Sequence, residues 1–169
     1  MIRQSLAAFF GLFIATTGTQ ATLAYHGKFP GKGSLSAWIE GAKLYDQATS
    51  LTKTGKLTAA NDLYRAAIKK YRFDSDFYYN LGHNLLEEKK LAEAESALQQ
   101  SAQLAPFDYI PTSLYGVTLY EEGKYSSAQK VLEKALQLAK TDDQKLHAEQ
   151  NLKELLDKIH STRGQKNVP

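Results

Sequence analysis

One 34-residue stretch, SDFYYNLGHNLLEEKKLAEAESALQQSAQLAPFD at residues 75–108, decides the fold of this chain. Its apolar residues recur three and four positions apart, as they do on one face of an α-helix. The polar run Glu88-Lys89-Lys90 interrupts this pattern midway, and Pro106 ends it, since proline cannot continue a helix. The stretch therefore predicts two antiparallel helices joined by a short turn.

The same pattern occurs on both sides of this stretch, in residues 41–74 and 109–142, without an insertion. Small side chains stand at three equivalent places of the three blocks: Ala48, Gly82 and Gly116; Ala60, Ala94 and Ala128; Ala67, Ser101 and Ala135. Small residues at these places let the two helices approach closely, whereas large ones would hold them apart. Because one block cannot bury its own apolar face, the blocks are expected to stack.

This pattern resembles the tetratricopeptide repeat family, whose 34-residue repeat is a helix–turn–helix with small residues and a closing proline. Residues 75–108 match it best, through Leu81, Gly82, Ala94 and Pro106, and the resemblance extends over residues 41–142. It implies an all-α fold, a right-handed solenoid of three helical hairpins. It also implies a concave surface, lined by the first helix of each repeat, that binds another protein.

The segments that flank the repeats complete the predicted organisation. Residues 142–160 carry one apolar stripe and predict a helix that caps the last repeat, so the folded domain is expected to span residues 35–160. Residues 25–34 hold Pro30 and several glycines, which predict a flexible leader. Residues 161–169 are expected to form a polar tail.

The first 24 residues differ from the rest of the chain. Arg3 is followed by an uncharged apolar run at residues 6–15 and by small residues that end at Ala24, the pattern of a secretory signal peptide. Cleavage is expected after Ala24 or after Ala21, which would export the protein to the periplasm or medium of a bacterium. The alternative is an uncleaved membrane anchor, although the apolar run is shorter than the roughly 20 residues of a spanning helix.

The charge composition argues against nucleic acid as a partner. The chain has 21 Lys and Arg against 18 Asp and Glu, a net charge of +3, and Lys and Glu alternate along the predicted helices. A nucleic-acid-binding domain usually gathers its basic residues on one face.

We find no arrangement of residues that predicts an enzyme, a metal site or a cofactor. There is no cysteine, and His26, His83, His147 and His160 include no pair at the i, i+4 spacing of a helical zinc site. The carboxylate pairs at residues 87–88 and 121–122 fall at helix ends, where we expect them to be solvated.

The repeat phase predicts which side chains face the concave groove. They are aromatic, polar and uncharged: Tyr45, Thr49, Thr52, Tyr79, Asn80, His83, Leu86, Ser113, Val117 and Tyr120. Tyrosine provides a large contact area and a hydrogen-bonding tip, a composition common in protein-binding surfaces. His147 and Asn151 are expected to continue the row on the capping helix.

Some members of the family grip the C-terminal carboxylate of a partner with a clamp of Lys, Asn and Arg. Here Asn80 matches one clamp place, but the other places hold Tyr45, Thr49, Ile110 and Leu114, so the basic residues are missing. The sequence thus predicts an exported scaffold that binds a protein or peptide other than an acidic chaperone tail. The alternative is a structural or self-assembly module, tethered to a membrane by an uncleaved N-terminal segment.

Overall fold

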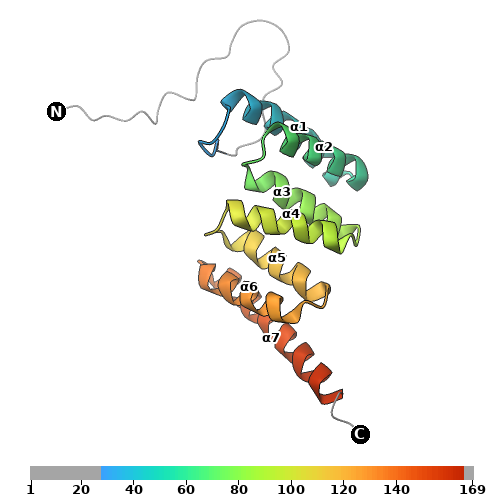
Figure 1. The fold of residues 1–169 in the computed structure, drawn as a ribbon, viewed down its shortest axis with the longest axis vertical. Helices are drawn as coiled ribbons and strands as arrows, with labels where there is room; N and C mark the ends of the chain where they lie inside the picture. Colours follow the sequence, from blue (N-terminus) through green and yellow to red (C-terminus); the bar gives the residue numbers. More distant parts are fainter. Residues whose placement is uncertain (1–27, 166–169) are drawn as a thin grey trace, which may run out of the picture.

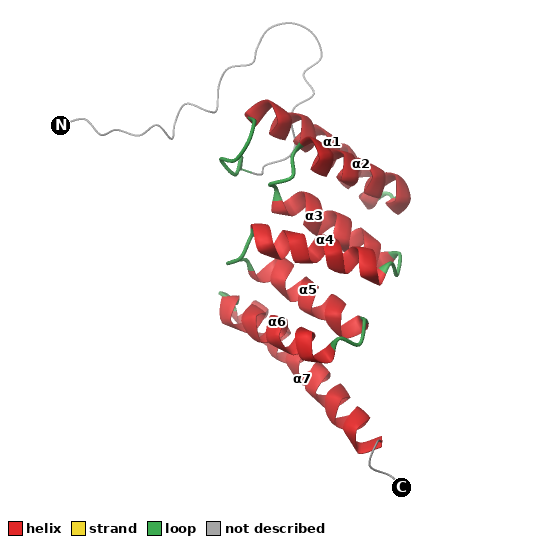
Figure 2. Cartoon of the chain, viewed as in Figure 1, coloured by secondary structure: helices red, strands yellow, loops and turns green. Residues whose placement is uncertain are grey.

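A computed structural model of the chain describes residues 28–165, so the predicted signal peptide lies outside the described residues. Within that range every regular element is a helix, which confirms the predicted all-α class (Figures 1 and 2). The helices follow one another as α1 (Leu35–Lys53), α2 (Leu57–Lys70), α3 (Ser75–Glu87), α4 (Leu91–Leu104), α5 (Tyr109–Glu121), α6 (Tyr125–Leu138) and α7 (Asp142–Gln165).

Three helical hairpins stack in one direction, and α7 follows the last of them (Figure 1). Along one side of the stack, α1, α3, α5 and α7 contact one another in succession. On the other side, the backbones of α2, α4 and α6 do not approach one another within residues 28–165, and α2 reaches α4 only through side chains. Helices on the inside of a curved stack lie closer together than those outside, so the odd-numbered helices line the concave face.

The two helices of a hairpin touch where the sequence supplies glycine. A Cβ atom added to Gly82 would lie 2.5 Å from Cγ of Leu98, and one added to Gly116 would lie 2.7 Å from Cδ2 of Leu132. Both leucines are almost fully buried. The small residues predicted at the eighth place of the repeat are therefore required by the close approach of the paired helices.

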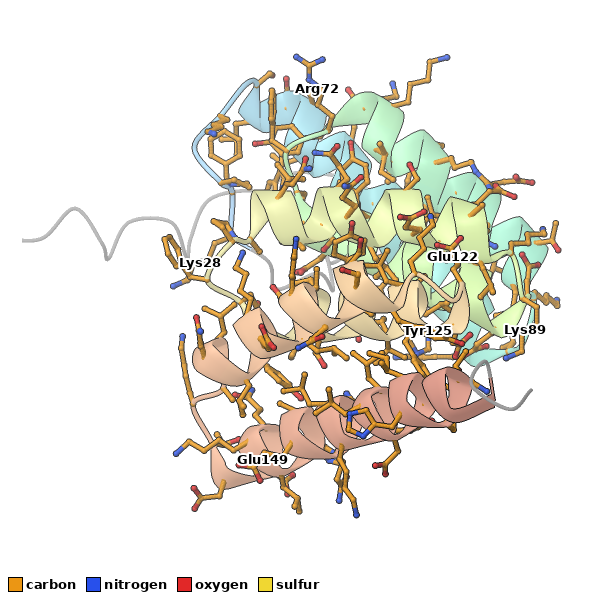
Figure 3. All side chains as sticks on the ribbon, turned by 60° about the horizontal axis from the view of Figure 1, so that its bottom comes forward. Lys28, Arg72, Lys89, Glu122, Tyr125 and Glu149 are labelled. Carbon is orange, nitrogen blue, oxygen red and sulfur yellow. The ribbon has the colours of Figure 1, made fainter. Side chains whose placement is uncertain are left out.

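The turns inside the three hairpins share one backbone conformation. Gly55 and Gly123 have positive φ angles of 73° and 76°, and Lys89 occupies the third equivalent place with φ 60°. A lysine in this left-handed region is strained, because its Cβ crowds the backbone where glycine has none. Figure 3 shows Lys89 at the edge of the stack that these turns form, opposite Lys28.

The turns between repeats end in helix caps. The Asp74 side chain accepts a hydrogen bond from the backbone N–H of Asp76, and the Asp108 side chain accepts one from Ile110. Such caps satisfy backbone donors that the first turn of a helix leaves without partners. Both aspartates thus fix where α3 and α5 begin, which sets the register of the residues on the concave face.

The described part of the predicted flexible leader is attached to the first repeat. Phe29 packs edge-on against Trp38 at 5.9 Å between ring centroids, and at the same distance against Tyr71. The Tyr71 hydroxyl donates a hydrogen bond to the Lys32 carbonyl, and Trp38 Nε1 donates to Asp74 at 2.9 Å. Residues 28–34 therefore cover part of the first repeat, and the contacts of Phe29 remove aromatic surface of Trp38 and Tyr71 from water.

The last helix is longer than the sequence predicts. α7 continues to Gln165, so the described part of the expected polar tail is helical. Its first half buries Ala148, and Leu155 beyond it is fully buried as well. None of the helices within residues 28–165 combines the length and the apolar character needed to cross a membrane.

Candidate partner-binding groove

Two hollows lie along the concave face, and the structure gathers half of the predicted groove residues around them. We call the hollow of about 250 Å³ that reaches from α1 across α3 to α5 the first hollow. It is lined by Tyr45, Ser75, Asp76, Tyr79, Asn80, Ser101, Asp108, Ile110 and Pro111. The second hollow, of about 160 Å³, lies where α5 meets α7 and is lined by Val117, Tyr120, Glu121, Leu132, Asn151 and Glu154.

The wall of the first hollow is rigid because its side chains bind one another. The Tyr45 ring stacks on the Phe77 ring at 5.3 Å between centroids. Asn80 Nδ2 donates to the Tyr45 hydroxyl at 2.8 Å and to the Asp76 carbonyl at 3.0 Å, so both amide hydrogens of Asn80 are engaged within the protein. Tyr79 is half-buried beside them, with its ring 6.3 Å from that of His83.

Three further predicted groove residues serve mainly to pack the first repeat and its junction with the second. The Thr49 and Thr52 hydroxyls lie 3.3 and 3.4 Å from the hydroxyl of the buried Tyr64. Thr52 also accepts a hydrogen bond from Asn84 Nδ2 at 2.8 Å. Leu86 packs against the same core cluster. All three predicted residues are half-buried and form the floor between the repeats, outside both hollows.

The second hollow is built by α5 and α7 together. The Tyr120 hydroxyl donates to Glu154 Oε1 at 3.2 Å, which links the last repeat to the capping helix across the groove. Its ring lies 5.9 Å from the Tyr125 ring, and Val117 packs on the core below. Asn151 lines this hollow, as the repeat phase predicts, whereas His147 is exposed and lines neither hollow.

Two predicted groove residues contribute less than expected. Ser113 occupies the repeat place of Tyr45 and Tyr79, but only 8% of it is exposed, because its short side chain does not reach the surface as a tyrosine does. His83 lies outside both hollows, with Nδ1 3.5 Å from Glu87 Oε1. His83 therefore borders the groove and does not line its hollows.

The carboxylates of the two hollows were missed by sequence reasoning. Asp76 and Asp108 line the first hollow, and Glu121 and Glu154 line the second. The repeat phase could have found Glu121, since it follows Tyr120 at the end of the same helix. Asp108 is a recognisable cap, but its position beside Tyr79 depends on how tightly the two repeats pack.

These carboxylates act on the tyrosines of the groove. Burial first, and then Asp108 and Asp76, raise the pKa of the Tyr79 phenol. Burial and then the hydrogen bond to Glu154 raise the pKa of Tyr120. Four carboxylates thus line the two hollows beside the uncharged residues that the sequence predicts.

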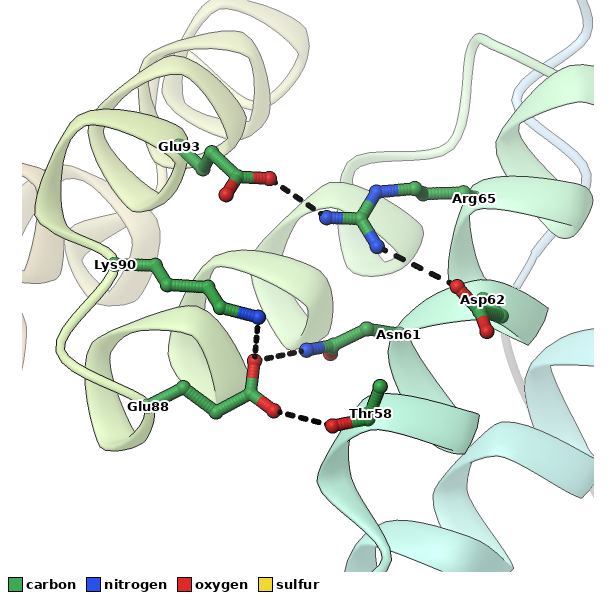
Figure 4. Close-up of polar contacts among 7 residues, drawn as sticks. All are labelled: Thr58, Asn61, Asp62, Arg65, Glu88, Lys90 and Glu93. Atoms are coloured by element: carbon green, nitrogen blue, oxygen red, sulfur yellow. Dashed lines mark hydrogen bonds and ion pairs between the residues drawn. The ribbon is translucent and has the colours of Figure 1, made fainter.

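Two equivalent carboxylates, Glu88 and Glu122, lie at turns where consecutive repeats meet. Glu88 joins its repeat to the preceding one directly, and beside Glu122 it is Lys124 that reaches the preceding repeat at Glu95. Glu88 accepts hydrogen bonds from Thr58 Oγ1 and Asn61 Nδ2, both at 2.9 Å, and pairs with Lys90 at 2.9 Å (Figure 4). Its counterpart one repeat later, Glu122, pairs with Lys124 at 3.0 Å.

The expectation that these carboxylate pairs are solvated is wrong for Glu88 and Glu122. Their side chains are only 15% and 11% exposed, because the preceding repeat covers them. The hydrogen bonds from Lys90 and then Thr58 lower the pKa of Glu88. Nearby, Arg65 bridges Asp62 and Glu93, the latter at 2.8 Å (Figure 4). These contacts fix the angle between repeats and so the shape of the groove.

The groove offers surface for binding and no arrangement typical of catalysis. Within residues 28–165 no three His, Asp or Glu side chains gather closely enough to hold a metal ion. The tyrosines and carboxylates of the hollows can form hydrogen bonds, aromatic contacts and ion pairs with a segment laid along the face.

These features define a helical-repeat scaffold with a concave binding face. Profiles of the tetratricopeptide repeat match residues 45–109 and 113–142, and the chain belongs to that family. No curated protein sequence matches the chain.

Several solved structures share the fold. The first TPR of Spaghetti (RPAP3), bound to HSP90 peptide SRMEEVD, has a TM-score of 0.65 at 21% identity and covers 71% of this chain and 93% of its own. The Sgt2 TPR domain from Aspergillus fumigatus has a TM-score of 0.66 at 16% identity, covering 77% and 85%. The Yersinia enterocolitica type III secretion chaperone SycD, in complex with a peptide of the translocator YopD, has a TM-score of 0.64 at 18% identity, covering 69% and 92%.

Proposed function

We propose that this protein is an exported scaffold that binds a segment of a partner protein along its concave groove. The observation that carries the proposal is the pair of hollows on one continuous face, each with a tyrosine at its wall. Solved relatives in fold hold peptides, among them an HSP90 peptide and a translocator peptide, which supports a peptide as the class of ligand. Tyr79 and Tyr120 provide the aromatic contacts, and the asparagines and carboxylates orient the bound segment.

The test removes the two groove tyrosines and leaves the fold. The variant with Tyr79→Ala and Tyr120→Ala should lose the partner proteins that the wild-type domain captures from its native compartment. A matched control carries Tyr78→Ala and Tyr115→Ala, since these half-buried tyrosines belong to the same helices but line neither hollow. Both variants should keep a helical circular dichroism spectrum. Equal capture by the two variants would place the binding site elsewhere.

We further propose that the groove does not bind acidic chaperone tails through a carboxylate clamp. At the clamp places this chain has Tyr45, Thr49, Ile110 and Leu114, none of them basic, and the amide hydrogens of Asn80 are engaged by Tyr45 and Asp76. A carboxylate also meets unfavourable potential from Asp76 and Asp108. Titration with the peptide SRMEEVD checks this, and saturable binding that Asn80→Ala abolishes would contradict it.

Export is proposed on the sequence of residues 1–24 alone. Mass spectrometry of the protein recovered from its producing cells measures where the chain begins. A mature N-terminus at Tyr25 or Thr22 supports a cleaved signal peptide, whereas an intact N-terminus in the membrane fraction supports the tethered structural module instead.

A further inference from the structure

The two hollows share a charge pattern that selects among possible partners. Two carboxylates line each of them, Asp76 and Asp108 in the first and Glu121 and Glu154 in the second. Among the described residues, neither hollow is lined by a lysine, arginine or histidine. The described lining of the two hollows thus holds four carboxylates and no basic side chain.

The helices that form the middle of the groove, α3 and α5, also lack lysine and arginine. No lysine or arginine of these helices can therefore neutralise the carboxylates. The basic residues lie instead on other helices, among them Lys43 and Lys53 on α1, Arg65, Lys69 and Lys70 on α2, Lys130 and Lys134 on α6, and Lys145, Lys153 and Lys158 on α7. The chain as a whole has a net charge of +3, opposite in sign to its groove.

Each hollow also places a tyrosine beside its carboxylates. Tyr79 stands with Asp76 and Asp108, and Tyr120 donates a hydrogen bond to Glu154. An aromatic ring attracts a cation through its negative face, and adjacent carboxylates strengthen that attraction. The combination suits an ammonium or guanidinium group on a flexible stem, since the stem can pack on the ring while the charge meets the carboxylate.

From these observations we infer that the groove binds a partner segment through two basic side chains, one in each hollow. This inference rests on the proposed function and adds the charge of the partner to it. The first hollow lies at the start of α5 and the second near its end, about 15 Å further along that helix. Together with one to two helix spacings across the stack, this puts the hollows roughly 18–25 Å apart, which an extended segment covers in about five to seven residues. The occupant is thus a Lys- or Arg-bearing segment with its cations about six residues apart.

The test uses three fluorescent peptides that share one uncharged sequence. At two places about six residues apart, the first carries lysines, the second glutamates and the third serines. The lysine peptide should bind most tightly and the glutamate peptide most weakly, and the difference should shrink at high salt. The direction is diagnostic, because the overall positive charge of the protein favours the acidic peptide if only bulk charge matters.

Variants locate the effect. Glu121→Gln with Glu154→Gln should weaken binding of the lysine peptide by roughly 3- to 10-fold and binding of the serine peptide by clearly less. Glu133→Gln with Glu149→Gln makes the same change of charge at exposed residues that line neither hollow, and it should have no effect on either peptide.

The outcomes separate this inference from the function on which it rests. Equal binding of the lysine and serine peptides, lost in the Tyr79→Ala and Tyr120→Ala variant, would overturn the basic partner and keep the groove as a binding site. Preference for the glutamate peptide would overturn it as well. Failure of all three peptides, together with dimerisation that the two tyrosine substitutions abolish, would contradict both proposals and assign the groove to a second copy of the chain.

Discussion

The close contact at Gly82 allows the effect of a substitution on the free energy of unfolding to be worked out in detail. In the variant Gly82→Ala the new Cβ would lie 2.5 Å from Cγ and 2.9 Å from Cδ2 of Leu98. Ordinary contacts between carbon atoms are about 3.5–4.0 Å, so the leucine must retreat by roughly 1 Å. Leu98 is fully buried and cannot move into solvent. Overpacking of this kind costs about 1–3 kcal/mol.

A second effect has the opposite sign. Alanine is a better helix former than glycine by about 1 kcal/mol, which offsets part of the clash. We therefore expect Gly82→Ala to lower the free energy of unfolding by about 1–2 kcal/mol. In a background that already carries Leu98→Ala, the clash is absent and only the helix propensity remains. There the same substitution should raise the free energy of unfolding by up to about 1 kcal/mol.

Urea denaturation of the four proteins of this double-mutant cycle, followed by circular dichroism, measures the coupling between the two sites. The cycle of Gly116 with Leu132 is an independent repetition, since the added Cβ would lie 2.7 and 2.8 Å from Cδ2 and Cγ of that leucine. If Gly82→Ala cost the same with and without Leu98, the close approach of α3 and α4 could not be the reason for the glycine.

Three further substitutions follow from contacts described above. Lys89→Gly should raise the free energy of unfolding by about 0.5–1 kcal/mol in urea denaturation, because it removes the left-handed strain of Lys89, which stands where the other two described hairpin turns have Gly55 and Gly123. Glu88→Gln should reduce the loss of stability on acidification, measured as the urea midpoint against pH. The folded protein lowers the pKa of Glu88, so this carboxylate stabilises the fold fully at pH values above its pKa in the unfolded chain. That stabilisation disappears as the pH falls through the pKa of Glu88 in the folded protein. Phe29→Ala should cost about 1–2 kcal/mol and shift the fluorescence of Trp38, the single tryptophan, to longer wavelength.

Matched controls make these predictions specific. Phe107 is 79% exposed, so Phe107→Ala should change neither stability nor tryptophan fluorescence. Gly123→Lys recreates at the third turn the strain of Lys89 and should destabilise by a similar amount. Equal effects of Phe29→Ala and Phe107→Ala would contradict the attachment of residues 28–34 to the first repeat.

The sequence predicts the repeat architecture well because the signals for it are local and periodic. Gly82 and Gly116 stand one repeat apart, and each reports directly on the close approach of its own helix pair. Lys89 could be recognised as strained for the same reason, since Gly55 and Gly123 show what the turn requires. Periodicity thus converts three weak signals into one strong assignment.

The parts that sequence reasoning missed depend on contacts between residues far apart in the chain. Glu88 is covered by Thr58 and Asn61 of the preceding repeat, so its burial cannot be deduced from its own neighbours. Phe29 lies among glycines and proline, and only the folded structure brings it to Trp38. The effect of the carboxylates on the groove tyrosines likewise arises only because Asp108, at the start of α5, lies near Tyr79 of α3.

The backbones of the outer helices α2, α4 and α6 lie too far apart to pack on one another, and this has a mechanical consequence. Within the described helices, consecutive repeats pack chiefly through an outer helix and the next inner helix, α2 on α3 and α4 on α5, whereas the outer helices reach toward one another only through side-chain links such as Arg65–Glu93 and Lys124–Glu95. The packed helix pairs form the strong part of each interface between repeats, whereas each exposed ion pair on the outer side contributes at most about 1 kcal/mol. Added salt should therefore weaken the ion pairs on the outer side and leave the packed helix contacts unchanged, which loosens the outer side of the solenoid without unfolding it.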